Sequence, residues 1–200
     1  SSVDTLGICN NDILLVIVPM FHANAWGTPY SAAMCGAKLV FPGPHLDGES
    51  LVELIQDEEV TLSAAVPTVW LGILQYLKGT GKGLGILERV VIGGTAAPPI
   101  MIRTLQEDYG VRVCHAWGMT EMSPLGTTGV LKKESLSLPK NEQYKLQEKQ
   151  GRGIYGVEMK IVDDKGMELP RDGIAFGNLM VRGPWIASGY FKGEGGDVLD

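Results

Sequence analysis

Ile13-Leu14-Leu15-Val16-Ile17-Val18 is an unbroken apolar run close to the start of the chain. A strand that helices cover on both faces needs apolar side chains at every position, and parallel sheets contain such strands. Similar short runs follow, separated by segments with helical periodicity. We expect them to form strands at residues 38–41, 60–66, 89–92 and 111–115. The alternation over residues 12–116 predicts an α/β fold, a parallel sheet with crossover helices.

Capping residues indicate where the crossover helices begin and end. Ser50 and Glu53 stand at capping-box spacing, so we expect a helix to begin there. Pro98 or Pro99 can open the helix before the fifth strand, because proline suits the first helical turn. Glycines that accept the left-handed conformation are expected to end three helices: Gly36, Gly79 and Gly110.

The sequence changes character after Glu121. Residues 132–150 are polar and rich in charge, and residues 157–162 then alternate before an Asp-Asp-Lys-Gly turn, with a further strand expected at residues 178–182. This alternation is typical of antiparallel hairpins. We therefore predict three parts: an α/β subdomain over residues 1–130, a polar helical linker over 131–150 and part of an antiparallel sheet or barrel over 151–200.

Composition excludes several classes of protein. The chain has 200 residues, of which 44% are hydrophobic, and this is enough for a core. Its net charge of −6 argues against a nucleic-acid partner, since phosphate backbones bind Lys/Arg-rich surfaces. No apolar run is long enough to span a bilayer and residues 1–4 do not resemble a signal peptide, so we expect a soluble, cytoplasmic protein. Cys9, Cys35 and Cys114 are expected to be free thiols, because their number and spacing suit neither disulfides nor zinc.

The unusual residues lie where ligands bind in open α/β sheets, beyond the carboxyl ends of the strands. Loops follow the first, third, fourth and fifth strands at residues 19–26, 67–68, 93–98 and 117–121. The last of these offers an indole face for stacking, a glycine for close approach, a hydroxyl and a carboxylate suited to Mg²⁺. Taken alone, it also fits a strand that enters a turn with Trp117 in the core. Four such loops at one edge favour a nucleotide site.

Several segments together resemble the adenylate-forming (AMP-binding) superfamily, most closely its fatty acyl-CoA synthetase branch. Val18-Pro19-Met20-Phe21-His22-Ala23-Asn24-Ala25-Trp26 resembles the Pro-x-Phe-His segment of that family. Gly93-Gly94-Thr95-Ala96-Ala97-Pro98 resembles its adenine loop, and Trp117-Gly118-Met119-Thr120-Glu121 its aromatic-Gly-x-Thr-Glu motif. Arg182-Gly183-Pro184-Trp185 and Gly189-Tyr190-Phe191-Lys192 resemble later segments. Medium-chain, long-chain and methylthiopropionate CoA ligases carry similar stretches.

The resemblance implies an acid-thiol ligase that uses ATP, Mg²⁺ and CoA. A small-molecule carboxylic acid would attack the α-phosphate of ATP to give an acyl-adenylate and pyrophosphate, and the CoA thiol would then displace AMP. Glu121 would hold Mg²⁺ and Thr120 would contact phosphate. His22 would border the carboxylate pocket and Trp26 would gate the acyl tunnel. From the residues alone, His22 also fits a helix-capping position and Trp26 also fits core packing.

The resemblance also implies which positions contact the nucleotide. Trp117 would stack on adenine, and residues 94–96 would line the adenine and acyl pockets. His115 stands where the family more commonly has glutamine. The implied nucleotide-binding positions are Gly94, Thr95, Ala96, His115, Ala116, Trp117, Gly118 and Thr120.

Other family elements have no counterpart in this sequence: the phosphate loop, the ribose-binding Asp of a Thr-Gly-Asp motif and the lysine of a mobile C-terminal domain. Gly196-Asp197 does not qualify, because no Thr precedes it. We therefore expect a central fragment of a larger ligase that is inactive alone and that self-associates through uncovered apolar surface. The alternative is a noncatalytic module that keeps part of a nucleotide or acyl pocket.

Two other glycine patterns suggest rival functions. Gly151-Arg152-Gly153-Ile154-Tyr155-Gly156 matches the dinucleotide fingerprint, but it precedes a predicted strand instead of opening a helix. Gly79-Thr80-Gly81-Lys82-Gly83 lacks the earlier glycine and the following Ser/Thr of a phosphate loop. An NAD-dependent oxidoreductase and a P-loop protein are therefore weaker interpretations than the ligase.

Overall fold

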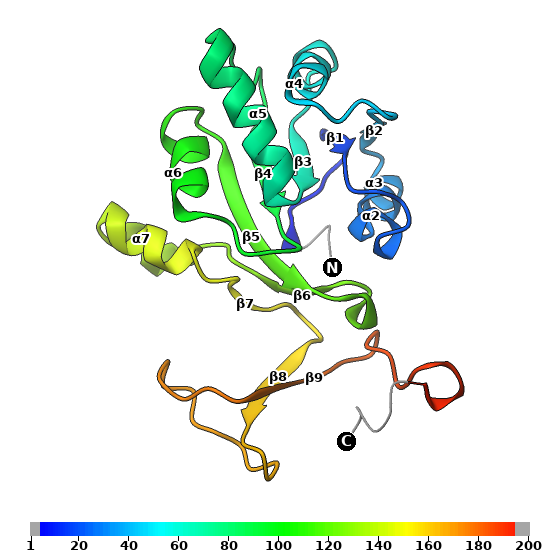
Figure 1. Cartoon of the computed structure of the whole chain (residues 1–200), viewed down its shortest axis with the longest axis vertical. Coiled ribbons are helices and arrows are strands. Elements are labelled where there is room, and N and C mark those ends of the chain that lie inside the picture. Colours follow the sequence, from blue (N-terminus) through cyan, green and yellow to red (C-terminus); the bar gives the residue numbers. More distant parts are fainter. Residues whose placement is uncertain (1–4, 195–200) are drawn as a thin grey trace.

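The expected parallel sheet is the centre of the fold (Figure 1). The computed structural model describes residues 5–194, so the start at residues 1–4 and Gly196-Asp197 lie outside the described residues. The parallel strands are β1 (Ile13–Val16), β2 (Lys38–Val40), β3 (Leu62–Ala65), β4 (Arg89–Ile92) and β5 (Arg112–Gly118). They lie in the order β2-β1-β3-β4-β5.

Alternate side chains of the strands enter two separate cores. Leu15 of β1 packs in the larger core with Ile55 and Trp70, whereas Leu14 and Val16 belong to a second cluster on the other face of the sheet. This explains why the run at residues 13–18 is apolar throughout. The helices are α2 (Ala23–Trp26), α3 (Thr28–Cys35), α4 (Gly48–Asp57), α5 (Pro67–Thr80), α6 (Pro99–Glu107) and α7 (Lys140–Gln147).

The predicted helix boundaries are partly wrong. The capping box does not form: the carboxylate of Asp47 accepts hydrogen bonds from the backbone N–H and the hydroxyl of Ser50, at 2.9 and 2.8 Å, and Asp47 is the N-cap of α4. Helix α5 continues past Gly79 and ends at Gly81, whose φ of +71° allows its N–H to bond the Leu77 carbonyl. The free N–H groups of the first helical turn can be capped by any nearby side-chain oxygen, and here the Asp47 carboxylate caps them. Sequence spacing alone does not show which of several such oxygens will do so.

Three other boundaries can be compared with the structure. Gly36 ends α3 with φ of +79°, as expected. Pro99 is the first residue of α6, which is also as expected. Gly110 does not end α6, because the helix stops at Glu107 with Asp108 as its C-cap.

The edge of the sheet beyond β5 is antiparallel. Strands β6 (Leu125–Thr128) and β7 (Arg152–Gly153) complete a 7-stranded sheet. Helix α7 packs on α6: Tyr144 is buried in the larger core and donates a hydrogen bond of 2.8 Å to Glu107. Segments expected to form a linker and a second subdomain therefore join the main body, and the three-part division stays a prediction.

Strands β8 (Glu158–Val162) and β9 (Asn178–Arg182) form a separate two-stranded antiparallel sheet, as the alternation predicts (Figure 1). The chain turns at Asp163 to Gly166 and forms a single bridge between Val162 and Glu168 before β9 pairs with β8. The remaining elements are short 3-10 turns: η1 (Thr120–Met122), η2 (Lys133–Ser137) and η3 (Phe191–Gly193). No helix among the described residues is long and apolar enough to cross a membrane.

The amino ends of the strands are joined by an ion pair. Asp12 and Arg89 are both mostly buried, and the Asp12 carboxylate also accepts hydrogen bonds from the Cys9 N–H and the Thr61 hydroxyl at 2.8 Å each. Burial alone would raise the pKa of Asp12. These hydrogen bonds and Arg89 together have the larger effect, so the pKa of Asp12 is lowered. All three cysteines are free, as expected, and burial raises the pKa of Cys114 to about 11.

Candidate nucleotide site

A cavity of about 140 Å³ lies where the first, fourth and fifth strands end. Most of the positions implied for the nucleotide and the acid lie in its wall. These are His22, Trp26, Gly94, Ala116, Trp117, Gly118 and Thr120. Complete small-molecule sites usually measure about 300–1,000 Å³. The cavity therefore has room for only part of a nucleotide or acyl group.

Trp26 and two glycines form one wall of the cavity. A Cβ atom on Gly93 would lie 3.4 Å from Cη2 of Trp26, and one on Gly94 would lie 3.0 Å from the Val66 side chain. Gly94 also has φ of +81°, a conformation that glycine adopts without strain. Trp26 also packs against the second core cluster around Ala25. Its side chain therefore both lines the cavity and contributes to core packing.

Residues 23–26 form a left-handed turn. Ala23, Asn24, Ala25 and Trp26 have φ between +41° and +55°. Each such residue costs about 1–2 kcal/mol, so the turn persists only because its surroundings fix it. His22 precedes the turn at the N-cap position, but its side chain makes no capping hydrogen bond. The imidazole instead lies beside Phe21, with ring centroids 4.7 Å apart, and lines the cavity.

The stretch at residues 117–121 was expected wholly beyond the fifth strand, but β5 continues through Gly118. Pairing with β6 produces an irregularity between Trp117 and Gly118. The N–H of Met119 then donates to the Pro124 carbonyl at 2.9 Å, and η1 begins at Thr120. This antiparallel pairing presents Trp117 and Thr120 to the cavity.

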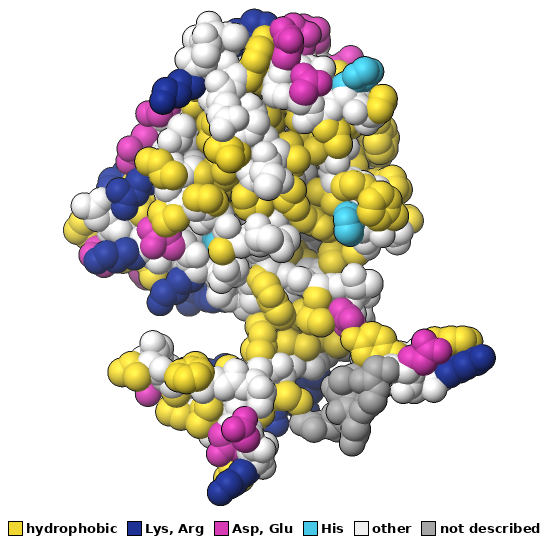
Figure 2. Space-filling model, viewed as in Figure 1, with side chains coloured by type: hydrophobic (Ala, Val, Ile, Leu, Met, Phe, Trp, Pro, Cys, Tyr) yellow, Lys and Arg dark blue, Asp and Glu magenta, His cyan; other side chains and the backbone are white. Residues whose placement is uncertain are grey.

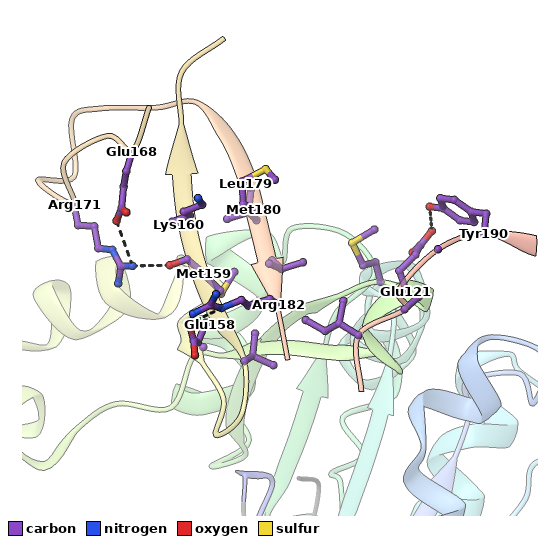
Figure 3. Close-up of a pocket in the computed structure, with 17 residues that line it drawn as sticks. Glu121, Glu158, Met159, Lys160, Glu168, Arg171, Leu179, Met180, Arg182 and Tyr190 are labelled. Carbon is purple, nitrogen blue, oxygen red and sulfur yellow. Dashed lines mark hydrogen bonds and ion pairs between the residues drawn. The ribbon is translucent and has the colours of Figure 1, made fainter. Parts of the chain in front are cut away.

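Glu121 lies outside the small cavity and contacts Tyr190 (Figure 3). The Tyr190 hydroxyl donates to its carboxylate at 2.5 Å, and this hydrogen bond lowers the pKa of Glu121 while it raises the pKa of Tyr190. The N–H of Ala187 donates to the Glu121 carbonyl at 2.7 Å, and the Ser123 hydroxyl donates to the Trp185 carbonyl at 3.0 Å. Residues 185–190 thus hold the turn that carries Glu121.

Sequence reasoning missed this contact, since 69 residues separate its two partners. The only signal was the presence of Gly189-Tyr190 in a segment that resembles the same family. Glu121 and Tyr190 border a larger open cavity of about 990 Å³ beside β8 and β9 (Figure 3). Glu158 and Arg182 of its wall form an exposed ion pair at 2.6 Å.

Three implied nucleotide positions lie outside the small cavity. Thr95 and Ala96 are exposed in the loop between β4 and α6. His115 is buried with 1% exposure: its Nε2 accepts from the Ala97 N–H at 3.1 Å, and its Nδ1 lies 3.2 Å from the Gln147 carbonyl oxygen. The imidazole is therefore engaged inside the protein and does not line the cavity.

Comparison with known proteins identifies the family. The family model described as AMP-binding enzyme matches residues 2–191. This chain belongs to the AMP-binding enzyme family. It is 52% identical over 196 residues to the 3-methylmercaptopropionyl-CoA ligase of Ruegeria lacuscaerulensis and to the medium-chain-fatty-acid–CoA ligase of Ectopseudomonas oleovorans. Each match covers 98% of this chain but 36% of the relative, so the chain spans about a third of their length.

Solved AMP-binding enzymes have the same fold. A long-chain-fatty-acid-CoA ligase of Archaeoglobus fulgidus is similar with a TM-score of 0.79 and 25% identity, over 95% of this chain and 38% of that one. The o-succinylbenzoate CoA synthetase of Bacillus subtilis, solved with its acyl-adenylate intermediate, is similar with a TM-score of 0.77 and 25% identity, over 97% and 37%. The resemblance to acyl-CoA ligases and the α/β fold with a small antiparallel sheet are both confirmed.

Glu121 is the candidate Mg²⁺ ligand of this AMP-binding enzyme. Among residues 5–194, no group of three or more His, Cys, Asp or Glu side chains could hold a metal ion by itself. Mg²⁺ on a nucleotide commonly takes only one or two carboxylates and completes its shell with phosphate oxygens and water. Glu121 directly follows Thr120 of the cavity wall, and the hydrogen bond from Tyr190 lowers the pKa of its carboxyl. These properties fit such a site.

Proposed function

We propose that this chain is the adenine- and acyl-binding part of an ATP-dependent fatty acyl-CoA ligase. The observation that carries the proposal is the meeting of Trp117, Gly94 and Thr120 in one cavity, with the ionised Glu121 beside it. The names of the two relatives at 52% identity support a ligase acting on a fatty or sulfur-containing carboxylic acid.

In the first step, an oxygen of the carboxylic acid attacks the α-phosphorus of ATP, and pyrophosphate leaves. In the second, the CoA thiol attacks the acyl carbon and AMP leaves. Trp117 provides a face for adenine, residues 94–96 approach its edge and Thr120 donates to phosphate. When bound at Glu121, Mg²⁺ would neutralise charge on the phosphates. The protein thus contributes mainly by positioning and electrostatic stabilisation.

Two further residues of the cavity wall, His22 and Trp26, suit the acid. His22 is unused by any cap, so its imidazole is free to hydrogen-bond a carboxylate. The indole of Trp26 covers Gly93 and Gly94, which places it between the nucleotide loop and the apolar core. We assign His22 to the carboxylate pocket and Trp26 to acyl access.

We propose that the 200-residue chain alone binds nucleotide without turnover. The wall of the small cavity contains no Lys or Arg among its described residues, so little there opposes the charge of a triphosphate. Incubation of the chain with ATP, Mg²⁺, CoA and fatty acids, followed by mass spectrometry, should detect no acyl-CoA. Binding of AMP or ATP is the most that the chain alone should show. The second candidate, a noncatalytic binding module, predicts the same result for the chain alone.

A chimera separates the two candidates. The 196 matching residues would replace the corresponding segment of the Ectopseudomonas oleovorans ligase. An active chimera is expected, and Glu121→Ala should reduce acid-dependent pyrophosphate exchange about a hundredfold, since one lost electrostatic contact costs about 3 kcal/mol in the transition state. Glu142→Ala, on the exposed face of α7, is the matched control. A chimera that folds but forms no adenylate would favour the noncatalytic module, and exchange within a few-fold of wild type in Glu121→Ala would refute the metal role.

The proposed partners are the acid, ATP and CoA, with no nucleic acid, and the proposed location is the cytoplasm. We also propose that the chain self-associates. Apolar side chains crowd the face over α2 and α3 (Figure 2), where Phe21 is 83% and Met34 is 80% exposed. Contiguous apolar surface of this kind commonly marks an interface. Sedimentation of the chain and of its Phe21→Ser, Met34→Ser variant should give a smaller species for the variant, and identical sedimentation would exclude this face.

A further inference from the structure

His115 joins the nucleotide loop to a helix that is distant in sequence. Its ring lies between the backbone of Ala97, at the end of the loop that follows β4, and the backbone of Gln147, the last residue of α7. Its own carbonyl accepts from the Gly129 N–H at 2.8 Å, just after β6. With 1% exposure, the side chain has no alternative hydrogen bonds with solvent.

The two partners determine where the proton of the ring lies. A backbone N–H can only donate, so Nε2, which contacts the Ala97 N–H, must be the unprotonated nitrogen. A carbonyl can only accept, so Nδ1 carries the proton and donates to Gln147. Only the neutral imidazole with its proton on Nδ1 makes both contacts.

Ala97 needs this acceptor. Its side chain is buried, and Pro98 and Pro99, which follow it, have no N–H group. Ala97 is thus the last backbone donor before α6, and a buried donor left without a partner is costly. The exposed residues 94–96, which we assign to adenine, immediately precede this anchored position.

The Gln147 end of the contact is also fixed. Its side chain exchanges two hydrogen bonds with Gln106 of α6, at 2.8 and 3.2 Å, and Gln106 also accepts from the Val113 N–H of β5 at 3.4 Å. The carbonyl that receives the imidazole proton therefore belongs to a helix already held against α6 and the sheet.

We propose that His115 is a positioning residue for the adenine loop, which it anchors at Ala97 against the C-terminal end of α7. The proposal rests on the assignment of residues 94–96 to adenine and adds that His115 acts through Ala97 without touching the nucleotide. Glutamine, with one acceptor and one donor, should substitute for the imidazole. Phenylalanine, with a ring of similar shape and no nitrogen, should not.

The test uses the whole chain, with ¹⁵N NMR of the ring, hydrogen exchange of the Ala97 amide and calorimetric titration with AMP. The wild type should have its ring proton on Nδ1. His115→Phe should accelerate Ala97 exchange and weaken AMP binding, each about tenfold, as the loss of one buried hydrogen bond predicts. His115→Gln should restore most of both. Val113→Ala, a packing loss in the same strand, should lower stability while leaving both readouts near wild type.

A ring proton on Nε2, or unchanged Ala97 exchange in His115→Phe, would overturn the proposal. So would AMP binding weakened equally by Val113→Ala, because a general loss of packing would then explain the effect. If the wild type binds no AMP, the adenine assignment fails, and the tautomer and the Ala97 exchange still decide whether His115 anchors the loop.

Discussion

Gly118→Ala should destabilise the protein, because a methyl group has no room at this position. Gly118 lies where the pairing of β5 and β6 is irregular. A Cβ atom would overlap the Pro124 carbonyl oxygen and would lie 2.8 Å from the Pro124 carbonyl carbon and 3.1 Å from Cα of Leu125. All three atoms are backbone, so no side-chain rotation relieves the overlap, and the two strands must separate.

The expected loss is about 3 kcal/mol, the upper end of the cost of overpacking, since the strain falls on backbone. For a domain with about 5–15 kcal/mol of stability, this is a large fraction. The displaced strand carries Trp117 and leads into the turn at Thr120, so AMP binding should weaken as well.

Urea unfolding followed by circular dichroism measures the first effect, and Gly79→Ala is the matched control. Gly79 lies in α5, and a methyl group added there would meet open space, with no packed neighbour within 4 Å. Alanine should therefore stabilise the protein by about 0.4–1 kcal/mol at this position. The same chemical change thus has opposite expected signs at two sites. Equal stability of Gly118→Ala and wild type, with normal AMP affinity, would refute the close approach of β5 and Pro124.

Three further predictions concern the acid pocket, the ion pair and the left-handed turn. In the chimeric ligase, Trp26→Ala should reorder substrates by chain length, since one methylene in a pocket is worth about 1–3 kcal/mol; a uniform fall in kcat/KM would leave only a packing role. The pKa of Asp12 is lowered in the folded state, so its stabilisation is present above about pH 4 and is lost as pH falls further. Asp12→Asn should cost about 3 kcal/mol at pH 7, because Arg89 loses its buried carboxylate partner and keeps only the exposed Glu88 and two backbone carbonyls. The substitution should also reduce the loss of stability at acid pH in urea unfolding; an unchanged loss would contradict this. Ala25→Gly should be neutral or stabilising in thermal unfolding, because glycine removes about 1–2 kcal/mol of left-handed strain; a clear loss of stability would show that the turn is unstrained.

Much of the candidate site could be located from the sequence, because the carboxyl ends of parallel strands share one edge of a sheet. His22 and Trp26 follow the first strand, Gly94 follows the fourth and Trp117 lies near the end of the fifth, and all four do meet in one cavity. The hydrogen bonds of the buried His115 ring could not be predicted, since its partners are backbone groups of Ala97 and Gln147. Every residue type has a backbone carbonyl and nearly every type a backbone N–H, so the sequence does not indicate which of them the ring will contact. The family motif placed His115 beside the nucleotide, whereas the fold buries its ring.

The sequence by itself determined the class of the fold and the identity of the family. Apolar runs that cannot face water specify buried strands, and short motifs keep their spacing along the chain. Only the tertiary structure decided that the strand at Arg112–Gly118 extends to pair with β6, that Asp47 caps α4 and that Tyr190 bonds Glu121. Each of these depends on which of several competing partners comes within hydrogen-bonding distance. That choice is made by the packing of the whole chain and not by any local stretch of residues.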